Sequence, residues 1–358
     1  MAGGRLHPAV AAVRLAVRRA LTAALDNPGG LGVGSLVLVG CSGGPDSLAL
    51  AAAAAFEAPK LGLRAGAITV DHGLQPGSAD HALQVQATLR GLGLDPVRRV
   101  AVDVQNRGVA PGYPGPEAAA RRARYAAFED ASADTGAGAV LLGHTMDDQA
   151  ESVLLGLARG SGARSMAGMA PAAGRYLRPL LGLRRDQTVA ACAALGLTAW
   201  QDPQNQDPAF TRSRVRMRIL PLMEELIGPG VTESLARTAD QLRSDADALD
   251  ELAAAAAEPL IGGWQAVPPD SPRSIPVVSV ADLPAAIRTR LLRRAAIAAG
   301  VPAGSLTANH IAELDALVSN YRGQRWLDLP GGVRCARRYG RLHFTAADHA
   351  AGRGGTES

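Results

Sequence analysis

Short apolar runs alternate with longer helical patterns in the first half of the chain, and this alternation limits its fold more than any other feature. Runs with the length and composition of buried strands occupy residues 35–40, 65–70, 97–102 and 139–143. Helical patterns follow them at residues 47–56, 79–92, 117–134 and 147–157. This order predicts an α/β protein with a Rossmann-like doubly wound parallel sheet, whose ligands bind at the carboxyl ends of the strands.

The second half of the chain has a different organisation and predicts a smaller α+β domain. Residues 203–208 are polar and turn-rich, and an arginine-dense helix is expected over residues 211–226, ended by Gly228 and Pro229. Further helices are expected at residues 232–257, 284–299 and 307–319, and short strands at residues 325–329, 333–337 and 342–345. The Pro-rich residues 267–276 give no assignment. We therefore expect domains over residues 1–221 and 222–345, with a disordered tail over residues 346–358.

Cysteine usage and charge limit the function only weakly. Cys41, Cys192 and Cys335 are too far apart to suggest a disulfide framework or a clustered thiolate metal site, so a reducing compartment is expected. Arginines interrupt the N-terminal helical stretch, and no apolar run is long enough to span a membrane, which favours a cytoplasmic protein. The net charge of +4 is compatible with an anionic partner without requiring one.

The sharpest local signal lies between the first predicted strand and its helix. It is made of Ser42, Gly43, Gly44, Pro45, Asp46 and Ser47. Adjacent glycines allow a ligand to approach the backbone, and the helix start directs free N–H groups toward an anion. The two serines add hydroxyl donors, and Asp46 can hold the Mg²⁺ of a polyphosphate. No lysine follows the glycines, so the segment is not the common Gly-x4-Gly-Lys phosphate loop.

Two further polar segments follow strand ends at the same predicted edge. His72 and Gly73 come after the second strand, where a plain glycine turn is the alternative interpretation. After the fourth strand come Asp147, Asp148 and Glu151, and helical spacing puts Glu151 on one face with both aspartates. Such a face attracts Mg²⁺ or an ammonium group, or it raises the pKa of one of the carboxyl groups toward the range of a general base. Acidic residues that simply complement a helix dipole are the alternative.

A fourth candidate is a charged helical stripe. Its members are Glu117, Arg121, Arg122, Arg124 and Tyr125, which alone would describe an exposed helix surface.

Residues 42–47 resemble the SGGxDS motif of the PP-loop ATP pyrophosphatases, which cleave ATP between the α- and β-phosphates. The resemblance extends over residues 34–221, because the segments at 154–162, 168–169, 178–181, 200–205 and 210–216 follow one another as in the lysidine synthetases. Three departures stand out: Gln75 replaces a usual arginine, Ser213 replaces a usual asparagine, and residues 105–116 are longer than usual.

This resemblance implies a carbon–nitrogen ligase that uses ATP, Mg²⁺ and L-lysine to modify the wobble cytidine of a tRNA(Ile) with a CAU anticodon. It implies nucleotide contacts at Val70, His72 and His144, beside the loop at residues 42–47. Arg122 or its neighbour Arg121 would reach the nucleotide or the substrate, and Asp147 or Glu151 would act as the base. Lysine would be bound by Asp147, Asp148, Glu151, Arg212 and Arg214.

The second domain would then bind tRNA. The candidate backbone contacts are Arg288, Arg290, Arg293, Arg294, Arg334, Arg337, Arg338 and Arg341, with a solvated basic face as the alternative. Whether the protein forms a homodimer is left open by the sequence.

Two other functions remain. A tRNA thiolase or an amidotransferase-type synthetase would keep the ATP site, but thiolases usually carry paired cysteines and here Cys41 stands alone beside the loop. A nucleotide sensor would bind ATP without turnover.

Overall fold

The computed structural model describes residues 6–73, 77–102, 116–160, 162–200, 207, 209–266 and 273–346. Several features predicted from the sequence lie outside these residues, among them Gln75, most of residues 105–116, residues 201–205 and nearly all of the expected tail. None of the described helices is long and apolar enough to cross a bilayer. The chain divides into two compact units, residues 1–243 and 244–358, which are described separately.

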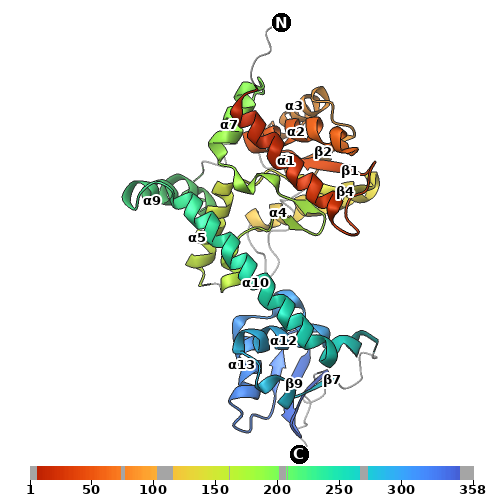
Figure 1. Ribbon diagram of the computed structural model, residues 1–358, viewed down its shortest axis with the longest axis vertical. Coiled ribbons are helices and arrows are strands. Elements are labelled where there is room, and N and C mark those ends of the chain that lie inside the picture. The colour runs from red at the N-terminus through yellow and green to blue at the C-terminus, as the bar shows by residue number, and fades with distance from the viewer. Residues whose placement is uncertain are drawn as a thin grey trace, which may run out of the picture. The chain divides into compact units, whose positions relative to one another are not determined.

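The first unit is built on a six-stranded, mostly parallel sheet, as the alternation of strands and helices predicts (Figure 1). Its strand order is β3-β2-β1-β4-β6-β5. The four predicted strands are β1 (Leu36–Gly40), β2 (Arg64–Asp71), β3 (Val97–Ala101) and β4 (Ala137–Leu142), all parallel. Two short strands complete the edge: β6 (Tyr176–Leu177) is parallel to β4, and β5 (Ala172–Ala173) is antiparallel to β6.

Helices cover both faces of this sheet, because the alternating side chains of its central strands are apolar on both sides. Val37 and Val39 pack with α1 (Pro8–Asp26), α2 (Pro45–Glu57), α3 (Ser78–Gly91) and α7 (Arg185–Ala194). Leu36 and Leu38 pack on the opposite face with α4 (Pro116–Thr135). Both faces being covered identifies the doubly wound arrangement.

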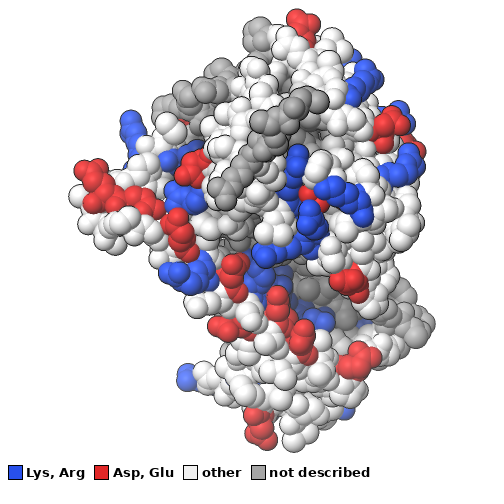
Figure 2. Space-filling model, turned by 45° about the horizontal axis from the view of Figure 1, so that its top comes forward, with Lys and Arg blue, Asp and Glu red and all other residues white. Residues whose placement is uncertain are grey.

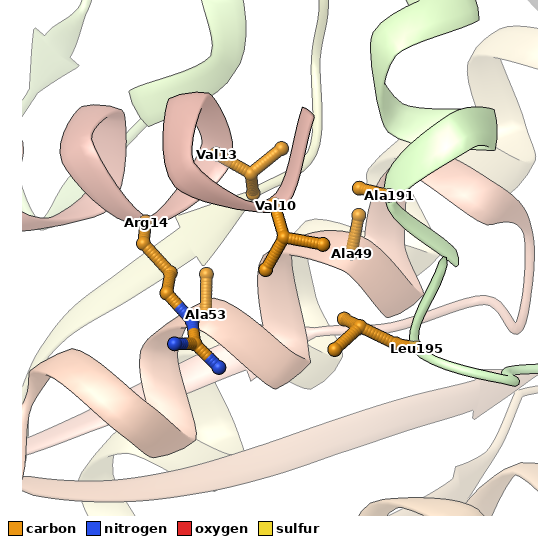
Figure 3. Close-up of a pocket in the computed structure, with 7 residues that line it drawn as sticks. All are labelled: Val10, Val13, Arg14, Ala49, Ala53, Ala191 and Leu195. Carbon is orange, nitrogen blue, oxygen red and sulfur yellow. The ribbon is translucent and has the colours of Figure 1, made fainter. Parts of the chain in front are cut away.

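Helix α1 lies against α2 and α7, and small side chains allow the close approach (Figure 3). Val10 and Val13 of α1 face Ala49 of α2 and Ala191 of α7, with Leu195 just beyond α7. The sequence did not predict α7. It has only ten residues, and its alanine-rich composition gives little contrast between apolar and polar faces.

Helix α5 (Met146–Ala158) follows β4 and is followed by α6 (Ala163–Met166). The arginine-dense stretch is helical as predicted, with α8 (Thr211–Arg214), a π-helical turn η5 (Val215–Ile219) and α9 (Leu220–Leu226) in succession. Val215 and Leu220 pack with Ala150 of α5, so this stretch and the start of α10 (Val231–Ile261) belong to the first unit. The compact units therefore divide inside α10, whereas the turn signals placed the joint at residues 221 and 222.

The second unit has helices on one face of an antiparallel sheet of order β7-β10-β9-β8. Its strands are β7 (Arg273–Pro276), β8 (Leu327–Leu329), β9 (Val333–Arg338) and β10 (Arg341–Ala346). Its other helices are α11 (Val278–Ala281), α12 (Ala285–Ala298) and α13 (Ala308–Ser319). Strand β7 comes from the end of the Pro-rich stretch to which the sequence gave no assignment, and residues 267–272 of that stretch lie outside the described residues.

Candidate active site

The loop between β1 and α2 has a backbone that only glycine fits. Gly43 has φ of +84°, and a Cβ there would lie 2.6 Å from Cγ2 of Val85 and 2.8 Å from the ring of His81. Gly44 caps α2, and Pro45 begins it. Ser47 Oγ accepts a hydrogen bond from the backbone N–H of Ser42 at 3.2 Å. The loop therefore folds around the N-terminus of α2, where N–H groups favour an anion.

Asp46 lies in the first turn of α2 and is mostly buried. Its Oδ2 accepts a hydrogen bond from Nε of Arg185 at 3.2 Å, and its Oδ1 accepts one from the Thr188 hydroxyl. Burial raises the pKa of Asp46 above the ordinary aspartate value, and the Arg185 guanidinium opposes that rise. No cluster of three metal-binding side chains occurs in the described part of the chain. One carboxylate together with substrate phosphates is a common way of binding Mg²⁺, and Asp46 is the residue here that could take this part.

The three carboxylates of α5 lie beside this loop but point to different partners. Asp147 accepts a hydrogen bond from the backbone N–H of Arg185 at 2.8 Å and so caps the start of α7. Asp148 caps its own helix by accepting from the Thr145 N–H at 2.8 Å. Glu151 is fully buried, as its helical position beside the aspartates allows. The predicted acidic face therefore exists, with each member held in place.

Four guanidinium groups surround these carboxylates. Arg185 contacts Asp148 at 2.9 Å, and Arg216 contacts the same oxygen at 3.0 Å. Burial alone would raise the pKa of Asp148, but Arg185 and Arg216 hold it below its ordinary range. The remaining short contacts are Arg212 Nε to Glu151 at 3.0 Å, Arg216 Nε to Glu151 at 2.6 Å, and Arg184 Nε to Asp147 at 3.7 Å. The charges of the cluster are thus nearly balanced.

Arg185 is the residue that brings the two motifs together. Its Nε binds Asp46 of the loop, its terminal nitrogen binds Asp148 of α5, and a third nitrogen lies 3.7 Å from Glu151. Sequence reasoning missed Arg185, Thr188 and the contacts of Arg216. The available signal was the pair Arg184-Arg185 placed directly after the apolar residues 179–183, at a helix start.

A second group of residues surrounds His144. Burial, together with nearby arginines, lowers the pKa of His144 to about 4, so the imidazole is neutral at pH 7. Its buried Nδ1 has no hydrogen-bond partner among the described residues. Arg121 and the buried Arg178 both donate to the Tyr125 hydroxyl, at 3.3 and 3.5 Å, and both contribute to lowering the His144 pKa. Sequence reasoning quoted Arg178 only as part of a motif and gave it no role.

These contacts distinguish between neighbouring candidates. Both Arg121 and Arg122 are exposed, but Arg121 donates to the Tyr125 hydroxyl and contributes to lowering the His144 pKa, so these contacts favour Arg121 for the predicted role. Arg212 binds Glu151, whereas Arg214 donates to the carbonyl of Ala209 and to the Thr211 hydroxyl.

The candidate residues of β2 lie at its carboxyl end. Val70 pairs with Val100 of β3 and packs against the core formed with α4. His72 Nε2 accepts a hydrogen bond from Arg124 at 3.4 Å. Both residues therefore lie at the edge of the sheet predicted for ligand binding.

Comparison with known proteins covers both units. Residues 15–223 match the PP-loop domain family, and residues 277–343 match the TilS substrate binding domain. A tRNA(Ile)-lysidine synthase of Thermobifida fusca is 57% identical over 95% of this chain and 98% of its own length. Those of Streptomyces coelicolor and Mycobacterium tuberculosis are 52% and 49% identical, over 94% and 80% of this chain and 98% and 82% of their own lengths.

A solved structure shares the fold of the chain. The U34-tRNA thiolase NcsA from Methanococcus maripaludis, with its [4Fe-4S] cluster, superposes with a TM-score of 0.53 at 18% identity, over 65% of this chain and 79% of its own. At that identity the likeness concerns the fold alone, and it confirms the predicted fold class. The match of both domains, and the close identity with relatives along nearly the whole length, show that the chain belongs to the tRNA(Ile)-lysidine synthase family.

Proposed function

We propose that this protein joins L-lysine to C2 of the wobble cytidine in a tRNA(Ile) with a CAU anticodon. ATP would be consumed through an adenylated cytidine, with release of AMP and pyrophosphate. The observation that carries the proposal is the bridge of Arg185 between Asp46 of the phosphate loop and Asp148 of α5. This bridge supports a single centre in which the phosphate loop would bind ATP and the carboxylates of α5 would bind an ammonium group.

In the first half-reaction, the cytosine O2 attacks the α-phosphate and pyrophosphate leaves. The N-terminus of α2 and the Ser42–Ser47 hydroxyl pair, 3.5 Å apart, would hold the leaving phosphates. Mg²⁺ held by Asp46 and the phosphates would neutralise part of the charge of the leaving group. Arg185 can then exchange Asp46 for a phosphate oxygen, because a guanidinium binds carboxylate and phosphate with similar geometry.

In the second half-reaction, the lysine ε-amine attacks C2 and must lose a proton, since its ordinary pKa is about 10.4. Of the two predicted bases, Glu151 has two guanidinium groups within 3.0 Å, while Asp147 has one at 3.7 Å. The Asp147 side chain is also 20% exposed, whereas that of Glu151 is fully buried, so an incoming amine reaches Asp147 more easily. We therefore assign the base to Asp147, and lysine binding to Asp148 and Glu151, with Arg212 facing the lysine carboxylate.

Sulfur transfer is the competing chemistry, and the cysteines argue against it. All three cysteines are buried. Burial raises the pKa of Cys41, that of Cys192 to about 11 and that of Cys335 to about 12. Thiols with raised pKa values are poor nucleophiles at neutral pH.

The decisive experiment supplies the purified protein with ATP, labelled lysine and a transcript of the CAU-anticodon tRNA(Ile). Label should pass to the RNA, with one pyrophosphate released for each lysine joined, and a transcript with uridine at the wobble position should stay unlabelled. Equal labelling of both transcripts would refute the assignment of the acceptor base. Pyrophosphate release without labelling of either would point to another acceptor. A cytoplasmic location and a homodimer stay predictions.

A further inference from the structure

Seven of the eight arginines predicted to face RNA in the second unit fall into two groups, and the eighth, Arg294, is exposed on α12. The side chains of the first group form hydrogen bonds or ion pairs within the second unit. Their contacts are Arg288 with Asp315 at 2.6 Å, Arg290 with Asp250 at 2.8 Å, Arg293 with the carbonyls of Ala303 and Leu306, and Arg337 with the carbonyls of Leu317 and Val318. These arginines hold helices and loops together, and Arg288 and Arg290 each have a carboxylate partner.

The second group lies on the sheet face that turns away from the helices. Cys335, Leu342 and Phe344 are buried in the core with α12 and α13. Because side chains alternate along a strand, Arg334 and Arg338 of β9 and Arg341 of β10 emerge on the other face. This face is therefore rich in arginine. In the view of Figure 2, basic and acidic side chains both occur.

Two of these arginines form a like-charged pair. Arg338 and Arg341 are direct cross-strand partners, an arrangement that is unfavourable unless an anion lies nearby. Neither forms an ion pair with a carboxylate among the residues that the structure describes, and Arg341 donates instead to the Ser274 hydroxyl at 2.9 Å. Arg334 has Asp328 at 2.7 Å, but that aspartate is itself largely exposed. The face therefore keeps an excess of positive charge.

Exposed aromatic rings flank the arginines. Trp326 is 41% exposed and has the guanidinium groups of Arg334 and Arg325 at 4.6 and 5.1 Å from its ring centroid. Tyr339, at the tip of the β9–β10 hairpin, is 98% exposed and has φ of +49°, which is unusual for a residue other than glycine. Tyr339 lies five positions after Arg334, which corresponds to about 16 Å of extended chain at roughly 3.3 Å per residue. No packing explains why a large ring occupies the tip.

We propose that this aromatic–arginine surface, formed by Arg325, Trp326, Arg334, Arg338, Tyr339 and Arg341, binds unpaired nucleotides of the RNA substrate. Arginines neutralise phosphates, and exposed rings stack on bases. Bases within a duplex are already stacked on one another, so the rings favour loops or single-stranded ends over a stem. The inference rests on the proposed function, which supplies the RNA, and it names the part of the substrate that this unit contacts.

The test measures RNA binding by the full chain through fluorescence anisotropy. Three labelled RNAs are used: the CAU-anticodon tRNA(Ile) transcript, a single-stranded oligonucleotide, and a duplex of the same length. Trp326→Ala and Tyr339→Ala should each weaken binding of the tRNA and of the single strand by about fivefold to 100-fold, and leave duplex binding unchanged. The double variant Arg338→Gln/Arg341→Gln should lower the slope of log Kd against log salt by about two.

Matched controls separate binding from folding. Arg90, exposed on α3 of the first unit and not among the predicted RNA contacts, is replaced by Gln and should leave binding unchanged. Tyr339→Trp keeps a stacking ring and should restore binding lost in Tyr339→Ala. Wild-type affinity for the single strand in both alanine variants would overturn the proposal, as would an equal loss in Arg90→Gln.

Lysine transfer separates this inference from the proposed function. If the wild-type protein transfers lysine and Trp326→Ala has an unchanged KM for tRNA, the surface is refuted and the function stands. If the wild-type protein binds single-stranded RNA through these residues but transfers no lysine, the proposed function fails and the surface stands.

Discussion

Replacing Arg185 with alanine tests whether one guanidinium holds the two halves of the candidate active site together. In the described part of the chain, Asp46 then loses its only guanidinium partner within 4.0 Å. Asp148 keeps Arg216 at 3.0 Å, and Glu151 keeps Arg212 and Arg216. The cost therefore falls chiefly on Asp46, which retains only the hydroxyl of Thr188 as a side-chain donor.

The expected loss of stability follows from the burial of these groups. Removing one partner of a buried ion pair costs about 3–5 kcal/mol. The side chains of Arg185 and Asp46 are 23% and 19% exposed, so water compensates for part of this, and we expect a loss of about 2 kcal/mol at pH 7.

The pH dependence gives the prediction its sign. Burial already raises the pKa of Asp46, and removing Arg185 raises it further. The folded variant then holds this proton at pH values where the unfolded chain, with an ordinary aspartate pKa of about 3.9, has lost it. The contribution of Asp46 to the stability of the variant is thus greatest at low pH and falls as the pH rises toward the folded-state pKa of Asp46. The variant should therefore lose less stability, relative to the wild type, at pH 5 than at pH 7.

Urea unfolding followed by circular dichroism at both pH values measures this. Arg184→Ala is the matched control. The neighbouring arginine pairs with the partly exposed Glu233 at 2.8 Å, and its contacts with Asp147 and Glu224 are longer, at 3.7 and 3.9 Å, so it should contribute less than about 1 kcal/mol. A loss in Arg185→Ala no greater than in the control, or a loss equal at both pH values, would refute the reasoning.

Three further outcomes are expected at the same site. Gly43→Ala should lower stability by about 2 kcal/mol or more in thermal unfolding, because the φ of Gly43 is +84° and a Cβ there would lie 2.6 Å from Val85. Gly44→Ala is the control and should not lower stability, because a Cβ there would lie 3.6 Å from its nearest neighbour. His144 is neutral when folded, so it contributes up to about 3 kcal/mol above the unfolded pKa near 6.5, and this is lost as the pH falls toward its folded pKa of about 4. His144→Asn should flatten the acid side of the stability profile, and an unchanged profile would contradict the cause given for the shift. Asp46→Ala should abolish pyrophosphate release while filter binding still retains tRNA, and unaffected turnover would exclude the Mg²⁺ role.

The sequence alone determined the fold class and which edge of the sheet is expected to bind ligands. Apolar runs that alternate with helical periods specify a parallel sheet, and glycines at a strand-to-helix turn specify an anion site, because both signals depend on neighbours along the chain. The order of the motifs likewise gave the family, and helical spacing alone put Glu151 on one face with Asp148.

Only the tertiary structure decided which partners these groups have. Arg185 and Asp46 are 139 residues apart, and their contact depends on how α7 packs beside α2. Arg216 reaches Asp148 and Glu151 from a π-helical turn that no sequence pattern indicated. Periodicity fixes the face of a helix on which a side chain lies, but the group that meets it across a packed interface depends on contacts between distant segments. For that reason the sequence could list the acidic residues of the site, and only the fold could supply the cations that balance them.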